Sequence, residues 1–139
     1  FLENLNGHDL IASTSEDHTV RLWGAETGAC QASLDGHSHS VTSVALMHLN
    51  RGEQRVLLTG SRDENIGIFD PLTMSFINKI PNYSGHVNAL CCLDDRDIVV
   101  FSDENTLVVY DLWEKKVVQE IKKHGDEVRC ISTLSLHDG

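Results

Sequence analysis

A nine-residue pattern that occurs three times constrains the fold of this chain more than any other feature. The copies run from Ser15 to Trp23, from Ser61 to Phe69 and from Ser102 to Tyr110, and they align without a gap. Their starting points lie 46 and 41 residues apart. Self-similarity at a period of roughly 20–50 residues is the signature of repeat proteins, in which each repeat forms one small structural unit. One repeated architecture must therefore account for all 139 residues.

The sequence around each copy predicts β-strands. Short alternating or β-branched runs bounded by turn residues lie at 41–47, 55–59, 97–101 and 116–121, and such runs are typical of strands. In every repeat an apolar residue also precedes a valine by seven positions: Leu34 and Val41, Ile80 and Val87, Ile121 and Val128. We therefore predict an all-β fold.

The marks of this repeat resemble those of the WD-repeat family. They are Gly36-His37, Ser15-Glu16-Asp17 and the strand that ends at Trp23. The resemblance implies β-propeller blades of four antiparallel strands each, named a (innermost) to d (outermost), around a central channel. On that plan the repeats span approximately 1–34, 35–80 and 81–121, and 122–139 starts a further blade.

Three repeats predict an incomplete ring, because closed propellers have about four to eight blades. We expect the strands of the first blade at 1–5, 9–14, 19–23 and 30–34, and a strand at 128–136 that opens the further blade. The sequence does not begin with Met, and we expect a piece of a longer protein that supplies the missing blades. The alternative is a second copy that completes the ring head-to-tail.

In the WD-repeat family a hydrogen-bonded chain holds each blade together, and the resemblance carries it onto this sequence. It joins a His before strand a, a Ser or Thr near the end of strand b, the Asp of the b–c turn and the Trp of strand c. The second repeat offers His37, Thr59 or Ser61, and Asp63. Phe69 stands where the Trp would be and cannot donate an indole N–H, so this chain should be one link short.

The other two repeats carry fewer of these residues. The first keeps Asp17 and Trp23, but its His position would fall before Phe1. The third departs most, with Tyr83 at the His position and Glu104 at the Asp position. A His, an Asp and a Ser together also suggest a hydrolase triad, but their recurrence from repeat to repeat favours a structural role.

A partner-binding surface is expected at the end of the propeller where the b–c and d–a loops meet, because loops on a rigid scaffold present binding side chains. The candidate residues there are mostly acidic: Glu16, Asp17, Arg62, Asp63, Glu64, Asp103, Glu104, Asp126 and Glu127. Several carboxylates around one channel mouth attract Lys- or Arg-rich segments. The alternative is that they only keep the domain soluble and satisfy turn geometry.

Trp113 is the candidate at the opposite end, in a c–d turn. An exposed tryptophan there would be a binding anchor. The alternative is that it packs on the aliphatic stem of Lys115 or Lys116.

Several classes of function are disfavoured. The formal net charge of −10 argues against nucleic-acid binding, which depends on neutralising phosphates with Lys and Arg. No apolar run approaches the length that crosses a bilayer, and no phosphate-binding glycine pattern indicates a nucleotide or another cofactor. The pairs His37/His39 and Cys91/Cys92 lack further ligands at a suitable spacing, so no metal is expected.

The remaining expectations concern location and function. The cysteines, at positions 30, 91, 92 and 130, lie in apolar runs and are expected to be buried, reduced thiols, which favours the cytoplasm or nucleus. We expect an intracellular protein–protein interaction scaffold without catalytic activity. The alternatives are a substrate-recognition subunit of a ubiquitin ligase or other modifying complex, and an enzyme on a propeller fold, which would need a cleft of perturbed ionisable groups.

Overall fold

The computed structural model describes residues 2–5, 8–81, 85–93 and 96–134, and these form three separate four-stranded sheets. We call the sheets blades one to three and their strands, in chain order, a to d. Blade one contains β1 (Leu2–Leu5), β2 (His8–Thr14), β3 (Val20–Gly24) and β4 (Cys30–Leu34). Blade two contains β5 (Val41–Leu49), β6 (Gln54–Ser61), β7 (Asn65–Asp70) and β8 (Ser75–Pro81). Blade three contains β9 (Leu90–Leu93), β10 (Ile98–Asp103), β11 (Thr106–Asp111) and β12 (Lys116–Lys122).

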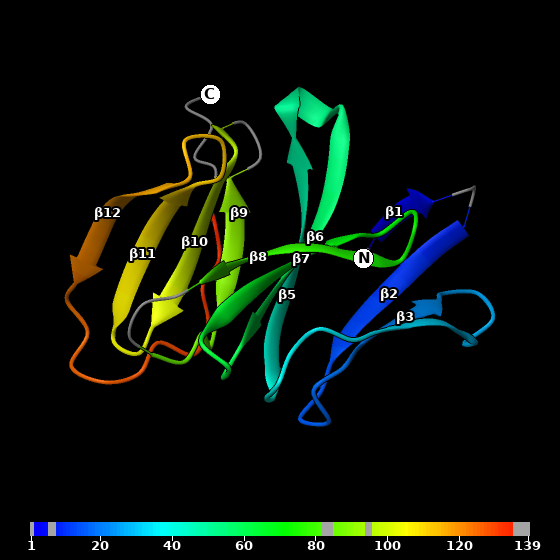
Figure 1. Cartoon of the computed structure of the whole chain (residues 1–139), viewed down its shortest axis with the longest axis horizontal. Coiled ribbons are helices and arrows are strands. Elements are labelled where there is room, and N and C mark those ends of the chain that lie inside the picture. The colour runs from blue at the N-terminus through cyan, green and yellow to red at the C-terminus, as the bar shows by residue number, and fades with distance from the viewer. Residues whose placement is uncertain (1, 6–7, 82–84, 94–95, 135–139) are drawn as a thin grey trace.

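The three blades lie side by side in chain order and do not close a ring (Figure 1). Within each blade every strand pairs antiparallel with its neighbour in sequence. A 3-10 turn at Asn50–Gly52 joins β5 to β6. The prediction of an all-β fold with four-stranded antiparallel blades in an incomplete ring is confirmed.

Blade two is buried on both faces because it lies between the other two. In β6, Val56, Leu57 and Leu58 are all at most 1% exposed. Successive strand residues point to opposite faces of a sheet, so Leu57 packs in the core against blade one while its two neighbours pack in the core against blade three. A continuous apolar run therefore replaces the alternation expected of a strand with one face in water.

Two apolar clusters hold the blades together. The cluster between blades one and two consists of Leu10, Val20, Leu22, Leu34, Val41, Leu57 and Phe69. The cluster between blades two and three consists of Met47, Val56, Leu58, Ile66, Ile80, Val87, Leu90, Val99, Phe101 and Val108. Each cluster contains side chains from both of the blades that it joins, so each core lies between two blades and not within one.

Backbone hydrogen bonds also link neighbouring blades at the start of strand a in blade two and just before strand a in blade three. The Val41 N–H donates to the Ser15 carbonyl at 3.0 Å, and the Val87 N–H donates to the Ser61 carbonyl at 3.1 Å. Gly60 permits the close approach of blade three, since a Cβ there would lie 2.5 Å from both Ser43 Oγ and Val87 Cγ1. The valine that marks each repeat is thus the point where a blade attaches to the preceding one.

The expectation of a strand at the end of the chain was wrong. No strand occurs over 128–134, the described part of the strand expected at 128–136, although the Val128 N–H donates to the Glu104 carbonyl at 2.8 Å. A strand a forms its ladder with strand b of its own blade, and no described strand pairs with this segment. Residues 135 and 136 lie outside the described residues.

The cysteines are less buried than expected. Cys30 and Cys130 are exposed, and Cys91 and Cys92 are half-buried. Cys30 lies on β4, the outermost strand of its blade, where an apolar residue can face solvent. No helix in the described residues is long and apolar enough to cross a membrane.

Candidate functional site

Blade two contains a buried hydrogen-bonded chain between His37, Asp63 and Thr59. His37 Nδ1 lies 2.8 Å from Asp63 Oδ2, and His37 Nε2 lies 2.7 Å from Thr59 Oγ1. The side chains of His37 and Asp63 are only 3% and 5% exposed. The d–a loop, strand b and the b–c turn of one repeat are therefore joined through a single imidazole ring.

Asp63 is the centre of this chain. Its carboxylate accepts from the Ser38 N–H at 3.0 Å and from the Asn65 N–H at 3.0 Å, besides the His37 ring. Burial raises the pKa of Asp63, but the hydrogen bonds from His37, Ser38 and Asn65 outweigh it, and the pKa lies below its usual value. An ionised carboxylate only accepts hydrogen bonds, so His37 Nδ1 carries the proton that it donates to Asp63.

The two hydroxyl candidates of blade two have different partners. Thr59 contacts the His37 ring, whereas Ser61 Oγ accepts from the Asp63 N–H at 3.1 Å and donates to the Ser40 carbonyl at 2.9 Å. Thr59 thus completes the chain, and Ser61 fastens the b–c turn to the d–a loop.

The sequence did not identify Gly67. Because this residue has no side chain, it leaves room for the hydrogen-bonded chain of His37, Thr59 and Asp63. Gly67 lies directly opposite Thr59 in the β6–β7 ladder. A Cβ at Gly67 would lie 2.7 Å from Thr59 Oγ1 and 2.8 Å from His37 Nε2, closer than real Cβ contacts. Phe69, at the Trp position, packs near the imidazole with its ring centroid 6.3 Å from that of His37 and makes the edge contact with Phe76 at 5.4 Å.

Blade one contains the hydrogen bond from the Trp of strand c, the part of the expected hydrogen-bonded chain that blade two lacks. Trp23 Nε1 donates to Ser13 Oγ at 2.9 Å. Ser13 was missed, but it holds the position of Thr59, since each lies two residues before the repeated Ser. Asp17 accepts from Thr19 Oγ1 at 2.6 Å and from the Thr19 N–H at 3.0 Å; these bonds hold the pKa of Asp17 below its usual value.

Blade three does not rebuild the chain, because its b–c turn is shorter. Two residues separate the last paired residues Asp103 and Thr106, whereas five separate Gly60 and Ile66 in blade two. Glu104 therefore lies exposed at the tip of the turn with a φ of 51°. Val100 stands at the hydroxyl position, and Tyr83, at the His position, lies outside the described residues.

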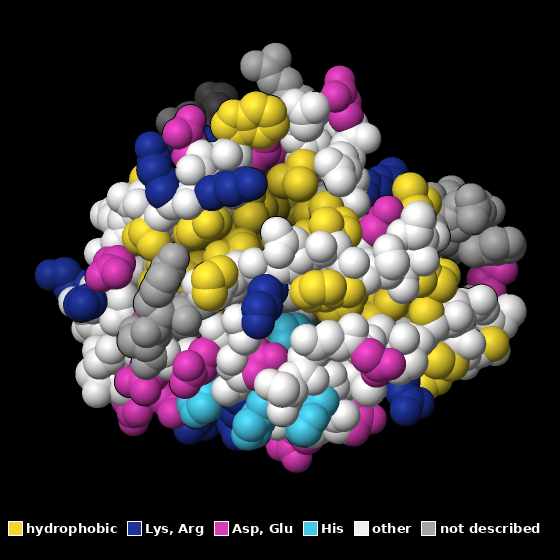
Figure 2. Space-filling model, in the orientation of Figure 1, with side chains coloured by type: hydrophobic (Ala, Val, Ile, Leu, Met, Phe, Trp, Pro, Cys, Tyr) yellow, Lys and Arg dark blue, Asp and Glu magenta, His cyan; other side chains and the backbone are white. Residues whose placement is uncertain are grey.

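The acidic candidates at the b–c end, the end of the blades that carries the b–c turns and d–a loops, differ in exposure. The exposed acidic ones are Glu16, Asp17, Glu64, Glu104, Asp126 and Glu127, and Arg62 is exposed as well. Asp103 is half-buried, and Asp63 was wrongly expected to be available to a partner, because its carboxylate is buried among donors of its own blade. Figure 2 shows acidic side chains along this lower edge of the molecule, with histidines among them.

A hollow of about 430 Å³ opens at the b–c end, and all three repeats and the segment 122–139 contribute to it. Its lining contains Thr42, Asn88 and Arg129, each of which directly follows the repeated valine. The repeat alignment could have identified these positions, because they are equivalent, but they lie outside the b–c turns. The remaining lining residues are Glu16, Ser40, Val41, Arg62 and Glu127. Arg129 joins Arg62 in this hollow, so the end carries a second cation that was not among the sequence candidates.

His18, His39 and His86 form a row at the same end, although no sequence pattern pointed to their grouping. The rings of His18 and His39 stack with centroids 5.8 Å apart, and those of His39 and His86 lie 6.4 Å apart. His86 Nδ1 donates to the Arg62 carbonyl at 2.8 Å. The row crosses all three blades, and its exposed ring faces are flat surfaces on which a guanidinium group can stack.

Trp113 lies in the c–d turn of blade three, at the opposite end, and is 74% exposed. Its N–H and that of Glu114 donate to Asp111 Oδ1 at 2.9 and 2.8 Å. Lys116 lies 3.5 Å from a Glu114 carboxylate oxygen. The turn is therefore fixed by hydrogen bonds while the indole faces solvent. Among the described residues, no three His, Cys, Asp or Glu side chains form a group that could hold a metal ion.

Comparison with known families identifies the same repeat. The sequence pattern described as "WD domain, G-beta repeat" matches residues 3–24 and 28–70, which cover blade one and strands a to c of blade two. The chain belongs to the WD-repeat family. The WD repeats of blades one and two are thus recognised by sequence. Blade three, whose residues differ most from the repeat pattern, is the part that is not matched.

Curated relatives and a solved structure show the same repeat. This WD-repeat chain is 28% identical over 126 residues to sterol regulatory element-binding protein cleavage-activating protein of Xenopus laevis, covering 91% of this chain and 9% of that protein. It is 25% identical over 120 residues to target of rapamycin complex subunit LST8 of Saccharomyces cerevisiae, covering 84% and 38%. The structure of U3-55K is similar in fold, with a TM-score of 0.75 at 19% identity over 87% of this chain and 38% of that chain. The chain thus spans less than half of each of these proteins.

Proposed function

We propose that these WD repeats are part of a protein–protein interaction scaffold without catalytic activity, and that the b–c end binds partner proteins. The observation that carries the proposal is the hollow lined by equivalent positions of three successive repeats, on loops held by the buried chain around Asp63. Binding surfaces on rigidly held loops lose little conformational freedom when a partner binds. A relative whose name identifies it as a complex subunit is consistent with this role.

The proposed partner is a Lys- or Arg-rich segment. Exposed carboxylates outnumber exposed arginines at the b–c end, and the chain carries a formal net charge of −10. A negative field around a channel mouth speeds the arrival of cationic segments at low salt. The imidazole faces of His18 and His39 add a stacking surface, which suits arginine better than lysine.

Fluorescence anisotropy with labelled octa-arginine and octa-lysine peptides tests this proposal. Binding should weaken as salt rises from about 50 to 200 mM, because exposed charges are screened. Replacing Glu16, Glu64 and Glu127 together by Gln should abolish it, whereas Glu114→Gln, which removes one carboxylate at the opposite end, should leave it unchanged. Arg62→Gln should strengthen it. Equal affinity of the triple variant and the unaltered chain would refute the b–c end as the binding surface.

We also propose that the protein works in a reducing compartment, the cytoplasm or the nucleus. The support is that Cys30 and Cys130 are exposed and free, and cellular thiol buffers keep such groups reduced there. Localising the fluorescently tagged chain in cells would test this, and an extracellular or luminal location would contradict it.

A further inference from the structure

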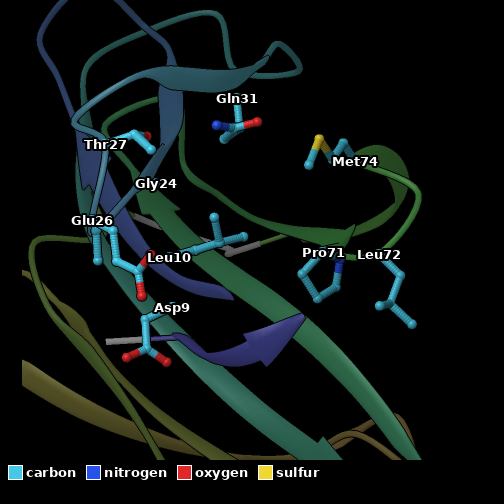
Figure 3. A pocket seen from close by; sticks show the side chains of 10 residues that line it. Asp9, Leu10, Gly24, Glu26, Thr27, Gln31, Pro71, Leu72 and Met74 are labelled. Atoms are coloured by element: carbon cyan, nitrogen blue, oxygen red, sulfur yellow. The ribbon is translucent and has the colours of Figure 1, made fainter. Parts of the chain in front are cut away.

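A second hollow, of about 380 Å³, lies where the c–d turns of blades one and two meet (Figure 3). Blade one contributes Asp9, Leu10, Gln31 and the turn 24–27, and blade two contributes Pro71, Leu72 and Met74. This is the end of the blades away from the b–c turns. A partner here would therefore leave the b–c end free.

One wall of this c–d hollow is apolar and exposed. Leu72 is 60% exposed and Met74 is 37% exposed, while Leu10 at 5% forms a buried floor. In Figure 3 Pro71 and Leu72 face the turn of blade one across the hollow. Two large apolar side chains that stay in water beside one hollow favour contact with another apolar group.

Hydrogen bonds fix both walls in place. Asp70 Oδ1 accepts from the Leu72 N–H at 2.8 Å, which closes the turn of blade two. In blade one the Gly28 N–H donates to the Gly24 carbonyl at 2.8 Å, and the Ala25 N–H donates to the Asp9 carbonyl at 2.9 Å. The hollow therefore exists before any partner arrives, which lowers the ordering cost of binding.

The other wall is acidic. Asp9 and Glu26 are exposed and lie on the same side of the hollow in Figure 3, and neither forms an ion pair with another described residue. The equivalent residues of the next repeat are Arg55 and Leu72. Since that repeat builds the same strands and turn without these acids, the two carboxylates are not required by the fold.

We propose that the c–d hollow binds a short segment of a partner protein in which an aliphatic or aromatic side chain adjoins a Lys or Arg. The apolar side chain would enter between Leu10 and Met74, and the cation would lie at Asp9 and Glu26. A volume of about 380 Å³ is near the low end of known ligand pockets and suits one or two side chains. Burial of the apolar group supplies affinity, and the carboxylates select the neighbouring charge.

NMR titration of the ¹⁵N-labelled chain with three acetylated octapeptides, identical except for a central Leu-Arg, Leu-Glu or Ser-Arg pair, tests this proposal. Leu-Arg should shift the amide signals of Ala25, Glu26 and Leu72 in a saturable way. The other two peptides should bind more weakly. Absence of saturable shifts at these amides at millimolar Leu-Arg peptide, or equal binding of all three peptides, would overturn the proposal.

Variants separate charge selection from loss of structure. Asp9→Asn with Glu26→Gln should weaken Leu-Arg binding by about two- to fivefold, as expected for exposed ion pairs, while Glu114→Gln in the third c–d turn should not change it. Asp9→Arg with Glu26→Lys should reverse the preference, so that Leu-Glu binds better than Leu-Arg. A charge-reversed chain that folds and still prefers Leu-Arg would overturn the assignment of the acidic wall.

Discussion

Replacing Asp63 by Ala should destabilise the chain more than any other single loss of an acidic side chain at the b–c end. The substitution removes the acceptor of His37 Nδ1, 2.8 Å away, at a site where the imidazole is only 3% exposed. An orphaned buried donor costs about 1–3 kcal/mol. Loss of the bond from the half-buried Asn65 N–H adds about 1 kcal/mol, whereas the exposed Ser38 N–H is rehydrated at little cost. The expected total is about 2–4 kcal/mol.

Urea unfolding followed by far-ultraviolet circular dichroism measures this difference. Glu104→Ala is the matched control, because the alignment gives it the same repeat position but its side chain is exposed at a turn tip. Asp63→Ala should lower the unfolding midpoint at an unchanged m-value, and Glu104→Ala should lower it far less. Equal midpoints for the two variants would refute the claim that the buried chain stabilises blade two.

A double-mutant cycle assigns the effect to the His37–Asp63 bond itself. If the two side chains act together, Asp63→Ala should cost about 1–3 kcal/mol less in a His37→Ala background than in the unaltered chain. Strict additivity would show that the two residues stabilise the fold separately, despite the 2.8 Å between them.

Three further predictions concern packing and pH. Gly67→Ala should cost about 1–3 kcal/mol in urea unfolding by overpacking, since its Cβ would collide with Thr59 and His37; Gly125→Ala, with nothing within 4 Å, is the control, and equal midpoints would contradict the crowding. Gly60→Ala should loosen blade three from blade two, seen as faster hydrogen exchange of the Val87 amide, and unchanged exchange would count against it. Because folding lowers the pKa of Asp63, its contribution is complete above the unfolded aspartate pKa of about 3.9 and is lost as pH falls below it. Asp63→Asn should therefore show a smaller loss of stability between about pH 5 and pH 3, and parallel pH curves would contradict this.

The repeat alignment predicted the three blades and the strands of blade one, because strand positions depend on local alternation and turn residues, which the sequence displays directly. It placed the start of blade three at Val87, whereas β9 begins at Leu90. It could not show that Glu104 fails to take the place of the Asp in a buried chain, since a gapless alignment does not reveal that the b–c turn of blade three is shorter. Gly67 was missed because a residue without a side chain carries no chemical mark, and its role depends on the imidazole that fills the space. Asp63 was expected both in the hydrogen-bonded chain and on the binding surface. The sequence alone could not exclude the second role, because the Ser38 N–H that helps to enclose its carboxylate comes from a loop 25 residues away.

The hydrogen bond that attaches each blade to the preceding one also makes it possible to measure the order in which the blades separate. Because the Val87 N–H bonds to the Ser61 carbonyl and Val87 is fully buried, this amide should exchange with solvent only when blade three separates from blade two. In a linear array of repeats, stability is approximately the sum of the intrinsic stability of each unit and the coupling between neighbours. The exchange rates at Val41 and Val87 would then report two successive coupling energies within one molecule, and a difference between them would show from which end of the array the chain unravels.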